Sequence, residues 1–284
     1  MRELTLVALP GIPEVARGAD LAGLLLAAVK RAGRTLESGD VMVIAQKIVS
    51  KAEGRSVRLA GVTPSARALE LAGVVGKDPR LVELMLCESR EVMRARPGVL
   101  IVEHRLGFVL ASAGIDQSNV SGPHGEEIVL LLPENPDASA RRIQQDLFAA
   151  CGVETGVIIN DSFGRAWRNG VTGVAIGVAG VPALVDLRGH PDRGGRPLRV
   201  TQVAAADELA AAASLIMGQS DEGYPAVLAR GFPYALRAST VDELIRPHAE
   251  DLFRCSSRWR EASAARAWRW GWRRRCRRRS SPSS

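Results

Sequence analysis

The sequence GVIINDSFGRAWRNG occupies residues 156–170 and shows how the chain is organised. Its first residues are apolar and β-branched, which predicts a buried strand over residues 156–160. Polar and charged side chains follow at once, from Asp161 to Arg168. Ligand sites in open sheets favour strand ends and the loops beyond them. We therefore expect residues 160–168 to form a loop at the end of a central strand and to contribute to a functional site.

The remaining elements predict a mixed fold. Further strands are expected over residues 3–9, 40–45, 99–103, 107–112, 172–178, 183–187, 198–203 and 226–229, with 99–103 and 107–112 forming a hairpin around Arg105. Helices are expected from Asp20 to about residue 32, from Pro64 to near residue 73, from Pro79 to about residue 93, from the cap Asp137 to about residue 150, over residues 207–217, and from Thr240. Strands and helices do not alternate strictly, so an α+β fold or a mixed α/β sheet is favoured over a doubly wound fold.

The charge of the chain is concentrated at one end. The 284 residues contain 38 Lys+Arg and 31 Asp+Glu, a formal net charge of +7, which by itself suggests a nucleic-acid or membrane-surface partner. Residues 255–284 hold ten Arg, no Lys and one Glu and so carry +9, which leaves −2 for residues 1–254. The same segment holds four of the five Trp. We predict a nearly neutral domain over residues 1–254 and a basic, disordered tail over residues 255–284.

Composition limits the class of protein further. Hydrophobic residues make up 46% of the chain and aromatic residues 4%, so a core of Ala, Val, Leu and Ile is expected. The four Cys and the four His show no metal-ligand spacing. The longest apolar run, residues 21–29, is too short to span a bilayer, and Glu3 and Pro10 argue against a signal peptide. We expect a cytoplasmic protein that has no membrane partner.

Several common nucleotide and catalytic motifs are missing from the sequence. It contains no GxxxxGK[ST], GxGxxG, GxSxG or HExxH pattern. Gly173, Gly177 and Gly180 lie on a predicted strand, where tight packing in a sheet is their expected role. If the chain handles phosphates, it does so without a Walker-type loop.

Two acidic loops indicate a metal site. Asp116 lies in GIDQSN just past a predicted strand, as Asp161 does after residues 156–160. Two carboxylates brought together repel unless a cation such as Mg²⁺ or Mn²⁺ lies between them. Ser162 can add a hydroxyl ligand, while Arg165 and Arg168 can clamp a phosphate or carboxylate. A single loop Asp is more often a turn or cap residue, but two such loops, one with a basic pair, favour a metal and phosphate site.

Three other polar segments leave two interpretations open. Lys47 and Lys51 lie in QKIVSKAEG (residues 46–54), which is either a phosphate contact or a solvated basic loop. The segment LPGIPE (residues 9–14) is either a plain connector or a ligand-lining turn. The segment GQSDEG (residues 218–223) by itself resembles a polar turn after a helix that ends at a glycine.

Taken together and in order, eight segments resemble the coenzyme F420-0:L-glutamate ligases, the γ-glutamyl ligases of deazaflavin cofactor biosynthesis. They are PGIPEV (10–15), GDVMVIAQKIVSKAEG (39–54), AGIDQSN (113–119), LLPENPDASA (131–140), NDSFGRAWRNG (160–170), AIGVAG (175–180), AADELAAAASLIMG (205–218) and ARGFPY (229–234). The resemblance covers residues 4 to 254.

The resemblance implies a GTP-dependent ligase. GTP and a divalent metal, Mg²⁺ or Mn²⁺, would activate a carboxylate on the phospholactyl or related side chain of the precursor as an acyl phosphate. GDP leaves, and the amine of L-glutamate then attacks to give an amide and inorganic phosphate, with later glutamates joined through γ-linkages. Metal ions and basic residues are needed because several negative charges meet in this reaction. K⁺ is a further candidate cation.

The resemblance also implies roles for individual residues. Asp116 and Asp161 match ligands of a first metal, and Ser162 stands where the family commonly has Thr, a ligand of a second metal. Gln219 matches the second-metal position in the nucleotide loop that begins at Gly218. The implied nucleotide contacts are Ile12, Pro13, Glu14, Val15, Gln46, Lys51 and Asn119. Arg165 and Arg168 are proposed from their chemistry alone. The family's intertwined homodimer of α+β fold, with the site near the subunit interface, is expected here too.

The tail departs from the resemblance. Some bacterial members continue into a flavin-binding nitroreductase-like domain, so we expect that domain's activity to be absent. The segment RWRWGWRRRCRRRSSPSS has no counterpart in the family. Two alternatives to the ligase are a different metal-dependent phosphoryl-transfer enzyme on the same scaffold and a nucleic-acid-binding protein that uses the tail.

Overall fold

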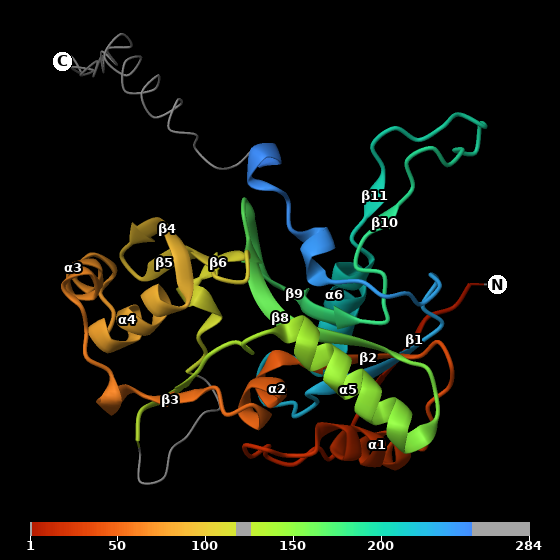
Figure 1. The fold of residues 1–284 in the computed structure, drawn as a ribbon, viewed down its shortest axis with the longest axis horizontal. Coiled ribbons are helices and arrows are strands. Elements are labelled where there is room, and N and C mark those ends of the chain that lie inside the picture. Colours follow the sequence, from red (N-terminus) through yellow and green to blue (C-terminus); the bar gives the residue numbers. More distant parts are fainter. Residues whose placement is uncertain (1, 118–125, 252–284) are drawn as a thin grey trace, which may run out of the picture. The chain divides into compact units, whose positions relative to one another are not determined.

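A computed structural model describes residues 2–117 and 126–251 of the chain. Residues up to Ile245 form one compact unit, built on a five-stranded sheet (Figure 1). Its strand order is β1 (Thr5–Ala8), β12 (Ala226–Arg230), β2 (Val41–Ala45), β8 (Gly156–Arg165) and β9 (Arg168–Ala179). Only β2 and β8 pair in parallel, and the other neighbours are antiparallel. The α+β class predicted from the sequence is confirmed.

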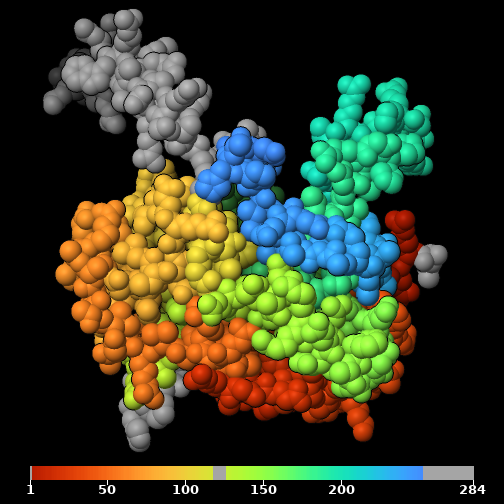
Figure 2. Space-filling view, viewed as in Figure 1, coloured from red at the N-terminus to blue at the C-terminus, as the bar shows by residue number. Residues whose placement is uncertain are grey.

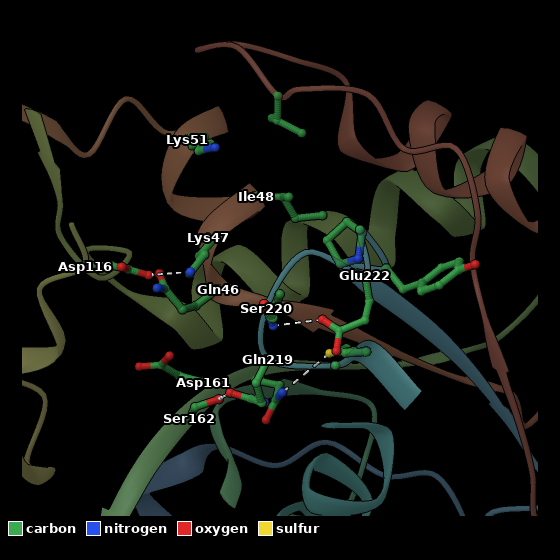
Figure 3. A pocket seen from close by; sticks show the side chains of 18 of the residues that line it. Gln46, Lys47, Ile48, Lys51, Asp116, Asp161, Ser162, Gln219, Ser220 and Glu222 are labelled. Carbon is green, nitrogen blue, oxygen red and sulfur yellow. Dashed lines mark hydrogen bonds and ion pairs between the residues drawn. The ribbon is translucent and has the colours of Figure 1, made fainter. Parts of the chain in front are cut away.

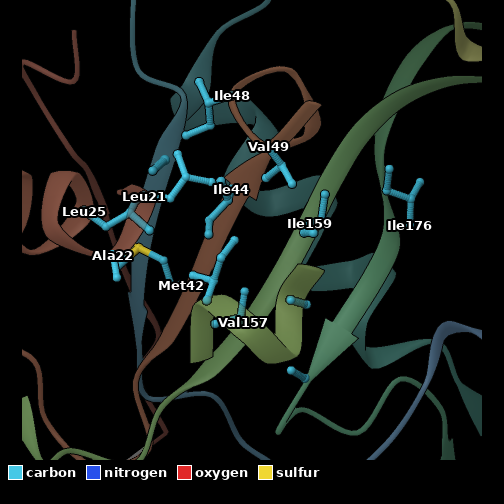
Figure 4. Packing of buried hydrophobic residues seen from close by; sticks show 14 of the residues in the cluster. Leu21, Ala22, Leu25, Met42, Ile44, Ile48, Val49, Val157, Ile159 and Ile176 are labelled. Carbon is cyan, nitrogen blue, oxygen red and sulfur yellow. The ribbon is translucent and has the colours of Figure 1, made fainter. Parts of the chain in front are cut away.

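Helices cover both faces of this sheet. Met42, Ile44 and Ile159 pack with α1 (Leu21–Arg31) and α5 (Pro136–Cys151) in one buried cluster (Figure 4). Val43 and Ile158, which point the other way, pack with α6 (Ala205–Met217) in a second cluster. Successive strand residues face opposite sides, so a strand covered on both sides is apolar throughout. This explains the uninterrupted apolar sequence of β2.

Close helix packing on β9 requires glycines. A Cβ added to Gly173 would lie 2.4 Å from the backbone oxygen of Ala210 in α6, and one added to Gly177 would lie 2.5 Å from the carbonyl carbon of Pro136 in α5. The predicted tight packing of these two glycines is confirmed. Without them, neither helix could approach the sheet as closely.

The helix caps are partly as predicted. The Asp20 carboxylate accepts the Gly23 N–H at 2.9 Å and begins α1. The cap of α5 is Asn135, not Asp137 as predicted, because the Asn135 side chain accepts the Ala138 N–H at 3.0 Å. Asp137 instead accepts the Val178 N–H of β9 at 2.8 Å and so fastens α5 to the sheet.

A smaller module lies beside the central sheet within the same unit. It comprises β3 (Ser56–Arg58), η1 (Leu59–Gly61), α3 (Ala66–Val75), α4 (Pro79–Cys87), β4 (Ser89–Arg96), β5 (Val99–His104), β6 (Val109–Ala111), η2 (Ser112–Gly114) and β7 (Ile128–Leu130). The predicted hairpin around Arg105 is confirmed as β5–β6. The prediction of one helix from Pro79 to about residue 93 is wrong: α4 ends at Cys87, and β4 pairs with β5.

An ion cluster joins this module to the segment before α5. The Glu88 carboxylate lies 2.9 Å from Arg55 Nη2, 3.0 Å from Arg105 Nε and 3.5 Å from Nε2 of the buried His104. Arg55 also donates to the Leu132 carbonyl. Burial raises the pKa of Glu88, but the His104 ring and the charges of the two arginines outweigh it and lower that pKa to about 2.

Other boundaries differ from the sequence predictions. The helix predicted from Pro64 is α3, which begins after the cap Ser65 and runs to Val75. The strand predicted over residues 156–160 continues as β8 to Arg165, and the helix predicted from Thr240 is only the short 3-10 turn η4 (Val241–Leu244). Strands predicted over 183–187 and 198–203 shorten to β10 (Val185–Asp186) and β11 (Gln202–Val203) (Figure 1). They lie in the arm that projects in the space-filling view (Figure 2).

The second unit begins at Arg246. Within it the structure describes residues 246–251, which include the 3-10 turn η5 (His248–Glu250). The predicted boundary after residue 254 and the tail 255–284 lie outside the described residues and stay predictions. Among the helices of residues 2–117 and 126–251, none has the length and apolar character needed to cross a bilayer.

Candidate active site

One edge of the central sheet holds a cavity of about 560 Å³ (Figure 3). Five parts of the chain line it: the segment after β1, helix α2 (Gln46–Ala52), the segment after η2, the middle of the β8–β9 hairpin, and the loop after α6. The lining includes Ile12, Pro13, Glu14, Val15, Gln46, Lys47, Lys51, Asp116, Asn160, Asp161, Ser162, Val171, Gly218, Gln219, Ser220, Glu222 and Tyr224. The site is therefore assembled from segments far apart in the sequence.

The sheet topology explains why these segments meet. β2 and β8 are parallel and in register at Ala45 and Asn160, so both point their carboxyl ends at the same edge. α2 follows β2 directly, and β8 continues into Asp161. β12 is antiparallel to β2 and starts at this edge, which brings the preceding loop 218–225 there as well. Ligand sites in sheets with parallel strands form at such carboxyl ends.

Asp116 and Asp161 both line the cavity, although they come from segments far apart in the sequence (Figure 3). Asp116 is held by a backbone bridge to Leu130, and Lys47 Nζ lies 2.7 Å from its Oδ2. Asp161 is half-buried on β8. The pKa of Asp161 is raised to about 7: burial is the main cause and the negative charge of Asp116 adds to it, while the Ser162 N–H and Lys47 lower it. A second cation near Asp161 would favour its ionised form.

Oxygen donors cluster around Asp161. Ser162 Oγ donates to Gln219 Oε1 at 2.8 Å, which links β8 to the loop after α6. The neighbouring Asn160 donates to Ser214 Oγ at 2.9 Å, while its own Oδ1 is buried without a hydrogen-bond partner. Carboxylate, hydroxyl and amide oxygens are hard ligands of the kind that Mg²⁺ and Mn²⁺ prefer.

These donors fit a metal that is shared with a substrate. Among residues 2–117 and 126–251, no three His, Cys, Asp or Glu side chains come together as a metal cage. Mg²⁺ is commonly held by one or two carboxylates together with substrate phosphates, and it keeps several waters. Asp116, Asp161, Ser162 and Gln219 match that incomplete donor set, so they can hold a metal whose remaining ligands come from a phosphate group.

Helix α2 places its polar residues on the cavity side. Lys51, whose side chain is only 13% exposed, lies 2.6 Å from the Glu14 carboxylate in the segment after β1. Gln46 is buried and accepts a hydrogen bond from Ser50 one turn later. Of the two interpretations left open for residues 46–54, the solvated loop is excluded, because most of this segment is a packed helix.

The loop after α6 binds its own carboxylate. Glu222 Oε2 accepts the Ser220 N–H at 2.8 Å, and backbone N–H groups of Ser220, Glu222 and Gln219 lower the pKa of Glu222. The carboxylate curls back over Gly218, where an added Cβ would lie only 2.1 Å from Glu222 Cδ. Backbone N–H groups arranged in this way form an anion-binding concavity.

Comparison with known proteins decides the family. The family model described as F420-0:Gamma-glutamyl ligase matches residues 11–231. The chain belongs to this F420-0:γ-glutamyl ligase family. It is 47% identical over 253 residues to the coenzyme F420:L-glutamate ligase of Methanothermobacter thermautotrophicus, covering 88% of this chain and 99% of that protein. The proteins of the same name from Methanopyrus kandleri (46% over 245 residues, 85% and 94%) and Archaeoglobus fulgidus (42% over 244 residues, 86% and 94%) are similarly related.

The γ-glutamyl ligase fold brings most of the predicted site residues into one cavity. Ile12, Pro13, Glu14, Val15, Gln46, Lys51, Asp116, Asp161, Ser162, Gly218 and Gln219 all line it. Asn119 lies outside the described residues. The individual roles assigned to these residues from the family resemblance stay predictions, although their convergence is a property of the structure.

The two predicted clamp arginines lie elsewhere. Arg165 is the last residue of β8 and Arg168 the first of β9, and they face each other across a two-residue turn. They therefore belong to a hairpin, not to the loop that the sequence predicted, because β8 continues five residues beyond Asn160. Neither arginine lines the cavity. A role for Glu222 was not predicted, since the sequence shows only two neighbouring acids, Asp221 and Glu222, between Gly218 and Gly223.

Proposed function

We propose that this chain is a GTP-dependent ligase that joins L-glutamate to the coenzyme F420 precursor through an amide bond. The observation that carries the proposal is the cavity in which Asp116, Asp161, Ser162, Gln219, Lys47 and Lys51 converge from four segments of the chain. The names of the relatives support the choice of glutamate and of the F420 precursor.

The proposed reaction has two steps. An acceptor carboxylate attacks the γ-phosphorus of GTP; the bond from that phosphorus to the β,γ-bridging oxygen breaks, and GDP leaves. The amine of L-glutamate then attacks the acyl carbon, loses a proton and expels inorganic phosphate. Activation is required because a free carboxylate is a poor acyl donor.

The chain's own residues position and neutralise the anions in this scheme. Lys47 and Lys51, which now pair with Asp116 and Glu14, can turn to phosphate oxygens. The amides around Ser220 can receive a phosphate in place of Glu222. Asp116, Asp161, Ser162 and Gln219 would hold Mg²⁺ or Mn²⁺. Such a metal supplies Lewis-acid stabilisation of the phosphoryl charge.

Further parts of the proposal rest on the family resemblance. They are γ-linked extension by more than one glutamate, a homodimeric assembly, a role for K⁺ and a cytoplasmic location. The small-molecule partners would be GTP, L-glutamate and the deazaflavin precursor.

The decisive assay supplies the purified chain with the unextended precursor, GTP, Mn²⁺ and L-glutamate. Mass spectrometry should show precursor that has gained one or more glutamyl units, together with GDP and phosphate in equal amounts. Omission of glutamate should abolish the product. GTP turnover that does not need glutamate would instead support a different phosphoryl-transfer enzyme, and salt-sensitive nucleic-acid binding that is lost on removal of residues 255–284 would support a tail-borne binding function.

A further inference from the structure

The turn of the β8–β9 hairpin exposes a strained tryptophan. Trp167 is 82% exposed and adopts φ +58°, in the left-handed region. A bulky side chain rarely occupies that region, which glycine or asparagine normally fills in such turns. Strain of this kind, when it is retained at an exposed position, points to a use for the side chain. Two arginines, Arg165 and Arg168, flank the turn.

A flat surface connects this turn to the cavity. Ser162 pairs with Gly173, and two positions further along the hairpin Gly164 pairs with Val171, so all four lie on the same face. Apart from its two chain neighbours, no described residue has an atom within 4 Å of the position that a Gly164 Cβ would occupy, and Val171 is 54% exposed while lining the cavity. From Ser162 to Arg165, where β8 ends, the strand extends about 10 Å, and Trp167 lies in the turn beyond it. An open, apolar strip therefore leads out from the metal-binding candidates.

The acceptor in the proposed function has matching chemistry. It carries a reactive carboxylate at one end, a phosphodiester beyond it and a planar fused ring at the other end. The carboxylate must reach Asp161 and Ser162 to be activated, so the rest of the molecule has to leave the cavity along an adjoining surface. Flat rings stack on indoles and apolar strips, and guanidinium groups pair with phosphate.

We infer that the outer half of the β8–β9 hairpin is the acceptor subsite, an assignment that rests on the proposed function. The planar ring lies against Gly164, Val171 and Trp167, and Arg165 or Arg168 meets the phosphodiester. Arg165 can turn to such a group, because within residues 2–117 and 126–251 its hydrogen bond is a long one, 3.4 Å from Nη2 to the Asn169 carbonyl. The subsite thus selects a planar anionic acceptor, whereas the nucleotide is held within the cavity.

A glycine variant separates binding from stability. Trp167→Gly keeps the turn and removes its strain, since glycine adopts positive φ freely. We expect the KM for the precursor to rise about tenfold or more, because the variant loses the binding energy of stacking on an aromatic side chain. The KM for GTP should stay unchanged, and the melting temperature should be equal or higher. Arg165→Gln should also raise the precursor KM alone. Val200→Ala is the matched control, because Val200 is 84% exposed on the arm and does not line the cavity.

Fluorescence tests the subsite without catalysis. The other four tryptophans, Trp259, Trp268, Trp270 and Trp272, all lie in the tail, so their replacement by Phe in the full chain leaves Trp167 as the single reporter. Titration with the precursor in the absence of GTP should quench it. Failure of ligation by the wild-type chain would refute the proposed function, while quenching would still locate the ring. The subsite assignment would be overturned if the wild-type chain ligates normally, the precursor does not quench Trp167 fluorescence, and Trp167→Gly leaves the KM for the precursor unchanged. A Trp167→Gly chain that changes its oligomeric state by sedimentation and loses GTP and precursor affinity equally would also overturn it, because the hairpin would then be an interface between copies.

Discussion

Replacing Asp161 with asparagine should destroy activity and yet stabilise the metal-free protein. The half-buried Asp161 carboxyl has its pKa raised from 3.8 to about 7. A raised carboxyl pKa means that the folded chain holds this proton more tightly than the unfolded chain. The protonated carboxyl therefore contributes its full share to the free energy of unfolding below about pH 4, and this contribution is lost as the pH rises through 7. The neutral amide of Asp161→Asn has nearly the same shape and avoids this loss.

The magnitude follows from the shift. About three pKa units at about 1.4 kcal/mol each give an upper limit of about 4 kcal/mol at pH 8. Relaxation and water entry around the half-buried group reduce the figure, so about 2 kcal/mol is a reasonable expectation. For a chain of this size that corresponds to a rise in melting temperature of roughly 4–8 °C. The gain should disappear at pH 4, where the wild-type carboxyl is protonated when folded.

Thermal unfolding at pH 4 and pH 8, in EDTA and in Mn²⁺, provides the assay. Wild-type protein should be stabilised by Mn²⁺, and Asp161→Asn should not respond, while its ligation rate falls at least a hundredfold. Asp186→Asn is the control, and it should lower the melting temperature at pH 8 instead of raising it, because Arg188 lowers the pKa of that exposed carboxyl to about 2. An Asp161→Asn chain that melts at or below wild type in EDTA at pH 8 would refute the buried-charge argument. Near-normal ligation would refute the metal assignment.

Three further outcomes follow from the same structure. Gly173→Ala should destabilise the chain by about 1–3 kcal/mol in urea unfolding, because its Cβ would collide with the α6 backbone at 2.4 Å, whereas Gly164→Ala, with open space around it, should change stability by less than about 0.5 kcal/mol. Glu222→Gln should bind GDP several-fold more tightly by calorimetry, since a neutral amide competes less well for the loop N–H groups; weaker binding would mean that Glu222 helps to hold a cation. Glu88→Gln should cost about 3 kcal/mol at pH 7, and because the pKa of Glu88 is lowered to about 2, that difference should shrink as the pH falls from about 4.5 towards 2 in urea unfolding.

The central strands could be predicted because a strand that is buried on both faces has an uninterrupted apolar sequence. β2 reads VMVIA with every side chain but the last buried, and Asp20 marks the start of α1. The strand β4 (Ser89–Arg96) has no such apolar pattern. Its sequence SREVMRAR suits a helix, and it is extended because it pairs with β5 across the turn at residues 97 and 98. Partner strands decided its conformation, and a single segment does not encode them locally.

The candidate site shows the same division. Asp116, Asp161 and Ser162 could be found because their polar side chains interrupt apolar segments. The role of Glu222 could not, since it depends on how the backbone of residues 218–222 turns its N–H groups inward. The local structure of Arg165 and Arg168 was predicted as a loop for a related reason: the continuation of β8 through Gly164 to Arg165 is set by pairing with β9 and not by a local pattern.

The charge of the cavity explains why the proposed reaction needs cations to begin at all. Its lining includes four acids, Glu14, Asp116, Asp161 and Glu222, against Lys47 and Lys51, so it is formally −2. A nucleoside triphosphate and an acceptor carboxylate each add negative charge to this cavity, and like charges a few ångströms apart repel each other. The two lysines are already paired with Asp116 and Glu14, so turning them to phosphate would leave those carboxylates in need of another positive charge. Divalent cations between the carboxylates and the phosphates reduce the repulsion between these anions and also neutralise the carboxylates that the lysines leave. Cation dependence under the proposed function therefore belongs to nucleotide binding as much as to phosphoryl transfer, and the arginine-rich end of the chain is not needed to supply it.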